Sequence, residues 1–162
     1  MLFLVLLLAA LGGAVTTVVL TVRGLVAVFR RGGRSRPARL RAAALLVGAA
    51  AVAMYAWGLL HVGVAVMQAE EDGGAGSFPI QPCREAGTQL ASQVTGYGVS
   101  YLPLRFECHL DGGDTYVTSS VPGYVNPAAV ALGLATAVCG LLATTTAKSA
   151  LPPASYAADR DG

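Results

Sequence analysis

The chain has 162 residues, of which 54% are hydrophobic and only 12% are charged, and its formal net charge at pH 7 is +2. Soluble globular domains carry about 25% charged residues, so this composition excludes an ordinary soluble domain. The mean hydropathy of +0.60 points the same way. Composition therefore indicates a membrane protein.

Three uncharged stretches are long enough to cross a bilayer. Residues 1–22, 42–67 and 127–147 contain no Asp, Glu, Lys or Arg. Each has at least about the 20 residues that a helix needs to span about 30 Å of hydrocarbon. We therefore expect a mainly α-helical membrane protein whose transmembrane helices cover residues 1–29, 38–67 and 126–147.

Basic residues gather where the first predicted helix ends and the second begins. Seven arginines occur in residues 23–41 without an acidic residue among them, at positions Arg23, Arg30, Arg31, Arg34, Arg36, Arg39 and Arg41. Residues 68–125 instead carry two arginines against seven acidic residues. Because Lys and Arg close to a span resist translocation, we expect the N-terminus outside, a basic cytoplasmic loop at residues 30–37, an extracytoplasmic domain at residues 68–125 and a disordered cytoplasmic tail at residues 148–162.

The predicted role of these arginines is to face the anionic lipids of the inner leaflet. Aromatic residues do not interleave with them, and the net charge is small, so nucleic acid is not an expected partner. A cleaved signal peptide is the alternative for the first stretch. However, signal peptides carry their positive charge before the apolar run, whereas here it follows, which favours a retained helix.

The second predicted helix is longer than the bilayer requires. Counting about 20 residues from Leu40 puts the outer boundary near Leu60, with Trp57 in the aromatic belt. The last turns, which include His61, then stand above the bilayer or tilt within it. An ionisable residue near a span is a functional candidate, although a histidine at a helix end can simply bond water, headgroups or the neighbouring loop.

The third predicted helix begins with Asn126 as an N-cap and Pro127 at its first position. Small residues recur along the first and third helices, for example Gly13, Ala129 and Gly133. Such rows allow helix backbones to approach closely. They are compatible with a compact three-helix bundle or with a homo-oligomer formed through one row.

Two cysteines lie in the predicted extracytoplasmic domain, Cys83 and Cys108. An oxidising compartment favours a disulfide between them, which would stabilise a module too small for a large core. The alternative is a thiol–disulfide catalyst. Such catalysts usually have closely spaced cysteines, as in C-x-x-C, so the spacing favours a structural bridge. Cys139, in the third helix, is interpreted as a small apolar residue.

The alternation of residues 104–110 predicts a strand, with Leu104, Phe106, Cys108 and Leu110 on one face and Arg105, Glu107 and His109 on the other. A turn at residues 111–114 and a return strand at residues 115–121 complete a β-hairpin. Residues 85–94 are expected to form one short helix. "EEDGGAGSFP" is interpreted as a flexible acidic linker, and the glycines of "VTGYG" at residues 94–98 as turns before the strand.

The fold class that follows is three transmembrane helices with a small disulfide-closed α+β extracytoplasmic domain, made of a β-hairpin and a short helix, between helices 2 and 3. No catalytic set, metal-ligand cluster or cofactor motif stands out in the sequence, so we expect neither an enzyme nor a metal or cofactor. The residues proposed to face a partner are His61, Arg105, Glu107 and His109.

The run "VSYLPLRFECHLDGGDTYVTSSVPGYVNP" and the preference for arginine over lysine resemble small integral membrane proteins of high-GC actinobacteria. The resemblance implies a multi-pass protein of the bacterial plasma membrane and no particular activity. Our leading hypothesis is a structural or binding module that contacts a membrane or cell-wall protein, or another copy of itself, through the extracytoplasmic domain. The alternatives are an envelope thiol–disulfide redox participant and an oligomeric pathway for ions or solutes.

Overall fold

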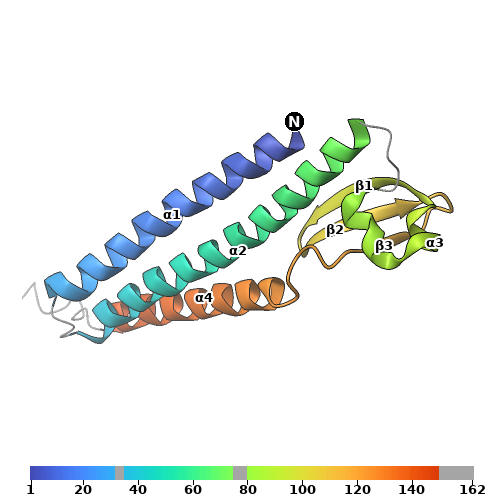
Figure 1. The fold of residues 1–162 in the computed structure, drawn as a ribbon. Helices are drawn as coiled ribbons and strands as arrows, with labels where there is room; N and C mark the ends of the chain where they lie inside the picture. The colour runs from blue at the N-terminus through green and yellow to red at the C-terminus, as the bar shows by residue number, and fades with distance from the viewer. Residues whose placement is uncertain (32–34, 75–79, 150–162) are drawn as a thin grey trace, which may run out of the picture.

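A computed structural model of the protein describes residues 1–31, 35–74 and 80–149 (Figure 1). Within these ranges, three helices are long and apolar enough to cross a membrane. They are α1 (Leu2–Arg31), α2 (Arg36–Gly74) and α4 (Val125–Ser149). The segment between α2 and α4 contains a 3₁₀ helix η1 (Gln81–Ala86), the short helix α3 (Thr88–Ala91) and the strands β1 (Val94–Tyr101), β2 (Leu104–Leu110) and β3 (Thr115–Val117). We call residues 80–124 the sheet domain.

Helix α2 lies between α1 and α4 and packs against both (Figure 1). Glycines mark the close approaches: a Cβ atom on Gly13 of α1 would lie 3.0 Å from Cβ of Ala56, and one on Gly48 would lie 3.3 Å from Cγ2 of Thr136 in α4. Gly133 of α4, in contrast, has no neighbour within 4 Å of such an atom. The arrangement is therefore a row centred on α2, not a mutually packed three-helix bundle.

Helix α2 has 39 residues and continues to Gly74. The sequence prediction of a flexible linker from Glu70 onwards is therefore wrong for residues 70–74, which are helical, whereas residues 75–79 of that predicted linker lie outside the described residues. The last turns of α2 bury one stripe of side chains, Leu59, Val62, Val66 and Ala69. This buried stripe explains why the helix persists beyond the length needed for a bilayer.

The sheet is antiparallel and has the order β1–β2–β3. The predicted strand at residues 104–110 and the turn after it are confirmed, and Gly113 takes a φ of 84° in that turn. Two predictions are wrong. The glycines of residues 94–98 lie within a strand, β1, and do not form turns before one, and the return strand ends at Val117 and not at Val121. The domain therefore has three strands, with Tyr97 opposite Cys108 and Cys108 opposite Tyr116.

The inward face of this sheet shares a core with α2. Leu104 and Phe106 of β2 are buried together with Val62 and Val66 of α2, and the N-terminal turns of α1 add Leu6. Leu104 and Phe106 are 1% and 0% exposed. One hydrophobic cluster thus joins the sheet domain to the long helices.

The predicted short helix at residues 85–94 is only partly correct. Helix α3 covers Thr88–Ala91, and η1 precedes it as a separate turn. Gly87, between the two, takes a φ of 94°, which glycine adopts without steric cost. The chain can therefore change direction there.

The start of α4 also differs from the prediction. Helix α4 begins at Val125, so Asn126 and Pro127 lie inside its first turn. The Asn126 side chain is not an N-cap. Its Oδ1 accepts from the backbone N–H of Leu104 at 2.9 Å, and its Nδ2 donates to the Leu104 carbonyl at 3.0 Å.

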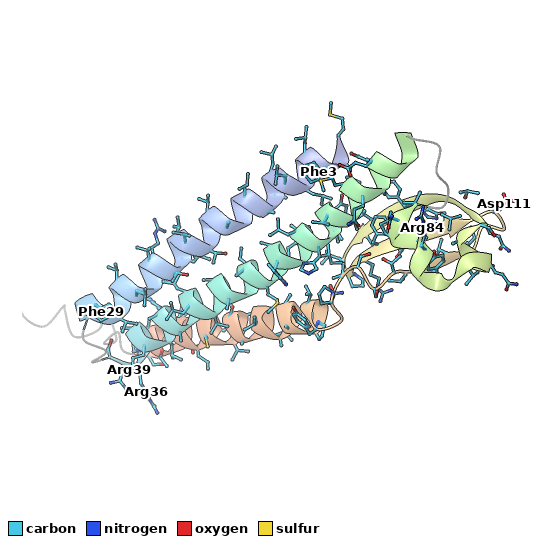
Figure 2. The ribbon with its side chains drawn as sticks, in the orientation of Figure 1. Phe3, Phe29, Arg36, Arg39, Arg84 and Asp111 are labelled. Carbon is cyan, nitrogen blue, oxygen red and sulfur yellow. A yellow bond between two sulfur atoms is a disulfide. The ribbon has the colours of Figure 1, made fainter. Side chains whose placement is uncertain are left out.

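Charged residues separate towards the two ends of the molecule. Figure 2 shows Arg36 and Arg39 at the end of the long helices remote from the sheet domain, and Arg84 and Asp111 in that domain. The Met1 amino group lies 3.9 Å from the Glu70 carboxylate, so the start of α1 is at the sheet-domain end. Arg36 and Arg39 on one side and the sheet domain on the other thus occupy opposite ends of the helices.

Candidate functional site

A cleft of about 730 Å³ lies where the C-terminal half of α2 meets the sheet domain. We call it the α2–η1 cleft. Its lining comes from three segments: the face of α2, the turn η1 and the loop after β3. The lining residues are Trp57, Leu60, His61, Val64, Ala65, Gln68, Gln81, Pro82, Arg84 and Ser120.

Helix α2 contributes to the cleft through its spacing. Trp57, His61, Val64 and Gln68 follow one another at intervals of four, three and four residues, so they lie on one face of the helix. The buried stripe, Leu59 to Ala69, is offset from this face and packs into the core. Because the core fixes the rotation of α2, it also fixes which side chains line the cleft.

Trp57 and His61 form a pair on the wall of the cleft that α2 provides. Their rings meet edge to face with centroids 4.8 Å apart, a favourable arrangement for aromatic rings. His61 Nδ1 lies 3.1 Å from the backbone carbonyl oxygen of Trp57. A carbonyl oxygen only accepts hydrogen bonds, so this contact requires the proton on Nδ1 and leaves Nε2 available to another group.

The opposite wall is η1, which the disulfide holds in place. Cys83 and Cys108 are bonded with their Cα atoms 6.1 Å apart, as the sequence predicted, and both are 0% exposed. The Tyr116 hydroxyl also donates to the Cys83 carbonyl. Two links from β2 and β3 therefore fix the residue next to Arg84. Arg84 itself is exposed and borders the cleft.

Ser120 reaches the cleft from the segment after β3. Thr118 Oγ1 and Ser120 Oγ are 2.8 Å apart, and the Thr118 backbone N–H donates to the Phe106 carbonyl at 3.0 Å. Thr118 is buried, so these bonds attach the loop to the sheet. The hydroxyl of Ser120 thereby has a fixed position at the cleft.

The cleft lining changes in polarity along α2. Trp57, Leu60 and Val64 give an apolar surface, whereas Gln68, Gln81 and Arg84 give a polar one. Among the lining residues that the structure describes, Arg84 is the permanent charge, and none is an aspartate or glutamate. The cleft is suited to an amphipathic ligand with a negative or neutral polar group.

The sequence-predicted polar candidates do not form one site. His61 lines the cleft, but Arg105, Glu107 and His109 occupy the outward face of β2, opposite Leu104, Phe106 and Cys108. His109 is adjacent to Cys108 in the chain but lies on the opposite face of the strand, so its side chain faces away from the disulfide. Gly98 lies under the His109 ring, since a Cβ there would be 2.7 Å from Nε2.

The basic candidates are exposed where the structure describes them: Arg23 on α1 and Arg36, Arg39 and Arg41 on α2. Arg34 and the side chains of Arg30 and Arg31 lie outside the described part of the chain. In the described ranges, no group of three or more His, Cys, Asp or Glu residues is arranged to hold a metal ion. Cys139 is a free, partly buried cysteine in α4.

Sequence reasoning missed Gln68, Gln81, Arg84 and Ser120 as members of a site. They come from three separate segments, α2, η1 and the loop after β3, and only the packing of α2 on the sheet brings these segments together. One signal was present: Arg84 directly follows Cys83, so a disulfide at Cys83 predicts a fixed position for its neighbour.

Neither a protein-family model nor a curated protein nor a solved structure matches the chain.

Proposed function

We propose that the protein is a multi-pass membrane protein of the bacterial envelope and acts as a non-enzymatic binding module. In this proposal α1, α2 and α4 cross the plasma membrane, the N-terminus and the sheet domain face outward, and the basic loop and the tail after Lys148 face the cytoplasm. The ligand or partner binds in the α2–η1 cleft. The single observation that carries the proposal is the core shared by α2 and the sheet domain, which makes a membrane helix one wall of the cleft.

The proposed membrane frame follows from contacts between helices. A Cβ atom on Gly58 of α2 would lie 2.7 Å from Cγ1 of Val125, so α4 starts at the level of Gly58. Trp57 and Tyr124 are both exposed near this level, as expected for residues at a membrane–water interface. About 20 residues from Gly58 towards its N-terminus, α2 carries Arg39 and Arg41, which supports an inner membrane boundary at these arginines.

The turn between β1 and β2 supports the same frame. Leu102 is 87% exposed at its tip. The Tyr55 hydroxyl donates to the Tyr101 carbonyl at 3.0 Å, which attaches this turn to α2 below Trp57. An exposed leucine beside apolar helix surfaces is suited to the outer leaflet.

The orientation rests on charge, because arginine-rich loops stay on the cytoplasmic side. It can be tested with single cysteines in a Cys139→Ala background. We expect a membrane-impermeant maleimide to label Gln93→Cys in intact cells and to label Ser35→Cys only after the membrane is permeabilised. Labelling of Ser35→Cys in intact cells would overturn the orientation.

The binding role can be tested by photo-crosslinking in native membranes. A diazirine amino acid at Val64, inside the cleft, is compared with one at Val117; both valines are about half exposed. We expect a discrete adduct from position 64 and none of the same mass from position 117. Identical adducts from both positions, or none from position 64, would contradict a binding role for the cleft.

A further inference from the structure

We propose that the α2–η1 cleft binds an anionic phospholipid whose headgroup carries a hydroxyl, such as phosphatidylglycerol, a proposal that rests on the binding role argued above. The ligand sits in the leaflet on the side of the sheet domain. Its phosphate lies at Arg84, its hydroxyl at His61 and its glycerol backbone along the apolar surface of Trp57, Leu60 and Val64.

The charge of the cleft selects a phosphate. Arg84 supplies a guanidinium at the cleft, and its five N–H donors allow it to bind a phosphate while keeping a contact within the protein. Guanidinium groups bind phosphate oxygens through paired, charge-assisted hydrogen bonds. The disulfide and the Tyr116 hydroxyl fix the backbone of the preceding residue, Cys83, so the cation is presented from a rigid turn.

His61 adds a preference for a hydroxyl. With its Nδ1–H directed at the Trp57 carbonyl, an imidazole that carries a single proton offers Nε2 as an acceptor. A hydroxyl can donate to that nitrogen, whereas a phosphodiester oxygen has no proton to donate. A headgroup with both a phosphate and a hydroxyl can therefore bind Arg84 and His61 together, and the amide of Gln68 can bond a remaining oxygen.

The apolar wall favours a lipid over a soluble phosphate. Trp57 and Gln68 are separated by eleven residues, which is about 16 Å along a helix. In the proposed frame this span begins at the edge of the hydrocarbon and crosses the headgroup layer. Trp57, Leu60 and Val64 lie at the hydrocarbon end of the cleft, where a soluble anion gains nothing and a lipid buries its glycerol and first methylene groups.

Trp57 provides the readout, because it is the only tryptophan in the chain. The full-length protein is placed in phosphatidylcholine nanodiscs and titrated with short-chain phosphatidylglycerol while the tryptophan emission is recorded. We expect a saturable shift. Arg84→Gln should raise the midpoint about tenfold. Arg105→Gln removes the same charge from the outward face of the sheet and should change the midpoint by less than about twofold.

The hydroxyl preference is tested with phosphatidylethanol, which has the same chains and charge and no hydroxyl. We expect the wild-type protein to bind phosphatidylglycerol about three- to tenfold more tightly. His61→Phe should abolish this difference, and His109→Phe should preserve it.

Three results would overturn the lipid assignment: equal binding of short-chain phosphatidylcholine, a response to glycerol phosphate or inorganic phosphate at the same concentrations, or no saturable shift with any lipid. A protein adduct from the crosslinker at Val64 together with any of these results would leave the binding role intact. If neither a lipid response nor an adduct were observed, both proposals would be overturned.

Discussion

The side chain of Asn126 pairs with both backbone polar groups of Leu104, accepting from its N–H at 2.9 Å and donating to its carbonyl at 3.0 Å. Leu104 begins β2 and is 1% exposed, and Asn126 lies in the first turn of α4. The two bonds act as a two-point attachment between the sheet domain and the long helix α4. They also satisfy backbone groups that a buried strand end would otherwise leave unpaired.

Asn126→Ala should destabilise the protein by about 2 kcal/mol, because two hydrogen bonds are lost and buried backbone groups remain. The measurement is thermal unfolding in detergent combined with amide hydrogen exchange, in which Leu104 should lose protection first. Gln89→Ala, at an exposed amide on α3, serves as the control. Unchanged protection of Leu104 in Asn126→Ala would show that the attachment contributes little.

Gly58 marks the tightest junction among α2, β2 and α4. A Cβ atom there would lie 2.6 Å from Leu104 Cδ2 and 2.7 Å from Val125 Cγ1, and both neighbours are almost fully buried. Gly58→Ala should therefore cost about 1–3 kcal/mol through overpacking, despite the better helix propensity of alanine. The melting temperature in detergent measures the change.

Gly12→Ala provides the matched control, since Gly12 is also helical and has no neighbour within 4 Å of a built Cβ. It should be neutral or slightly stabilising. If Gly58→Ala were as stable as Gly12→Ala, the junction would be more adaptable than its geometry indicates.

The parts of the fold that the sequence predicted are those set by local composition. Uncharged runs predicted the three long helices, and the alternation at residues 104–110 predicted β2 and its buried face. The cysteine count predicted the disulfide. Each of these signals is contained within one segment, or within a pair of residues that has no competing partner nearby.

The parts that were missed depend on contacts between distant segments. β1 contains Gly96 and Gly98, which weaken a strand intrinsically, yet the absent side chain of Gly98 leaves room for the ring of His109 on β2. Residues 70–74 carry acidic residues and two glycines, but they continue a helix whose preceding turns are buried. The α2–η1 cleft likewise required Arg84 and Ser120 to be brought to α2 by the sheet, and no local pattern encodes that.

Tyr97 should make the sheet domain sensitive to alkaline pH. Burial raises the pKa of the Tyr97 hydroxyl above its usual value of 10.0, and the Glu70 carboxylate raises it further. A raised pKa means that the folded state holds the proton more tightly than the unfolded state does. The associated stability is therefore fully present below a pH of about 10 and is lost as the pH rises through the folded pKa.

Tyr97→Phe should reduce this alkaline loss and retain the stacking on Phe106, whose ring lies 5.3 Å away at an interplanar angle of 11°. The measurement is the unfolding midpoint between about pH 8 and about pH 11, with Tyr124→Phe at an exposed tyrosine as the control. Equal alkaline sensitivity in the wild type and Tyr97→Phe would assign the loss to another group.

The Cys83–Cys108 disulfide should behave as a structural bridge and not as a redox catalyst. Both cysteines are 0% exposed, and a thiolate cannot attack a sulfur that it cannot reach. We expect the bond to resist dithiothreitol until the protein is unfolded, with a reduction potential below about −300 mV. Thiol counting with a maleimide of high mass, in a Cys139→Ala background, measures the reduction.

Removing the bridge should then cost about 3 kcal/mol, because the linked residues are 25 apart in sequence and the unfolded chain regains its freedom. Cys83→Ala with Cys108→Ala should therefore lower the melting temperature. It should also weaken phosphatidylglycerol binding, since η1 no longer holds Arg84 at the cleft, whereas Arg84→Gln should weaken binding with the disulfide intact. Rapid reduction of the folded protein, with no loss of stability afterwards, would instead favour an exchange-active disulfide.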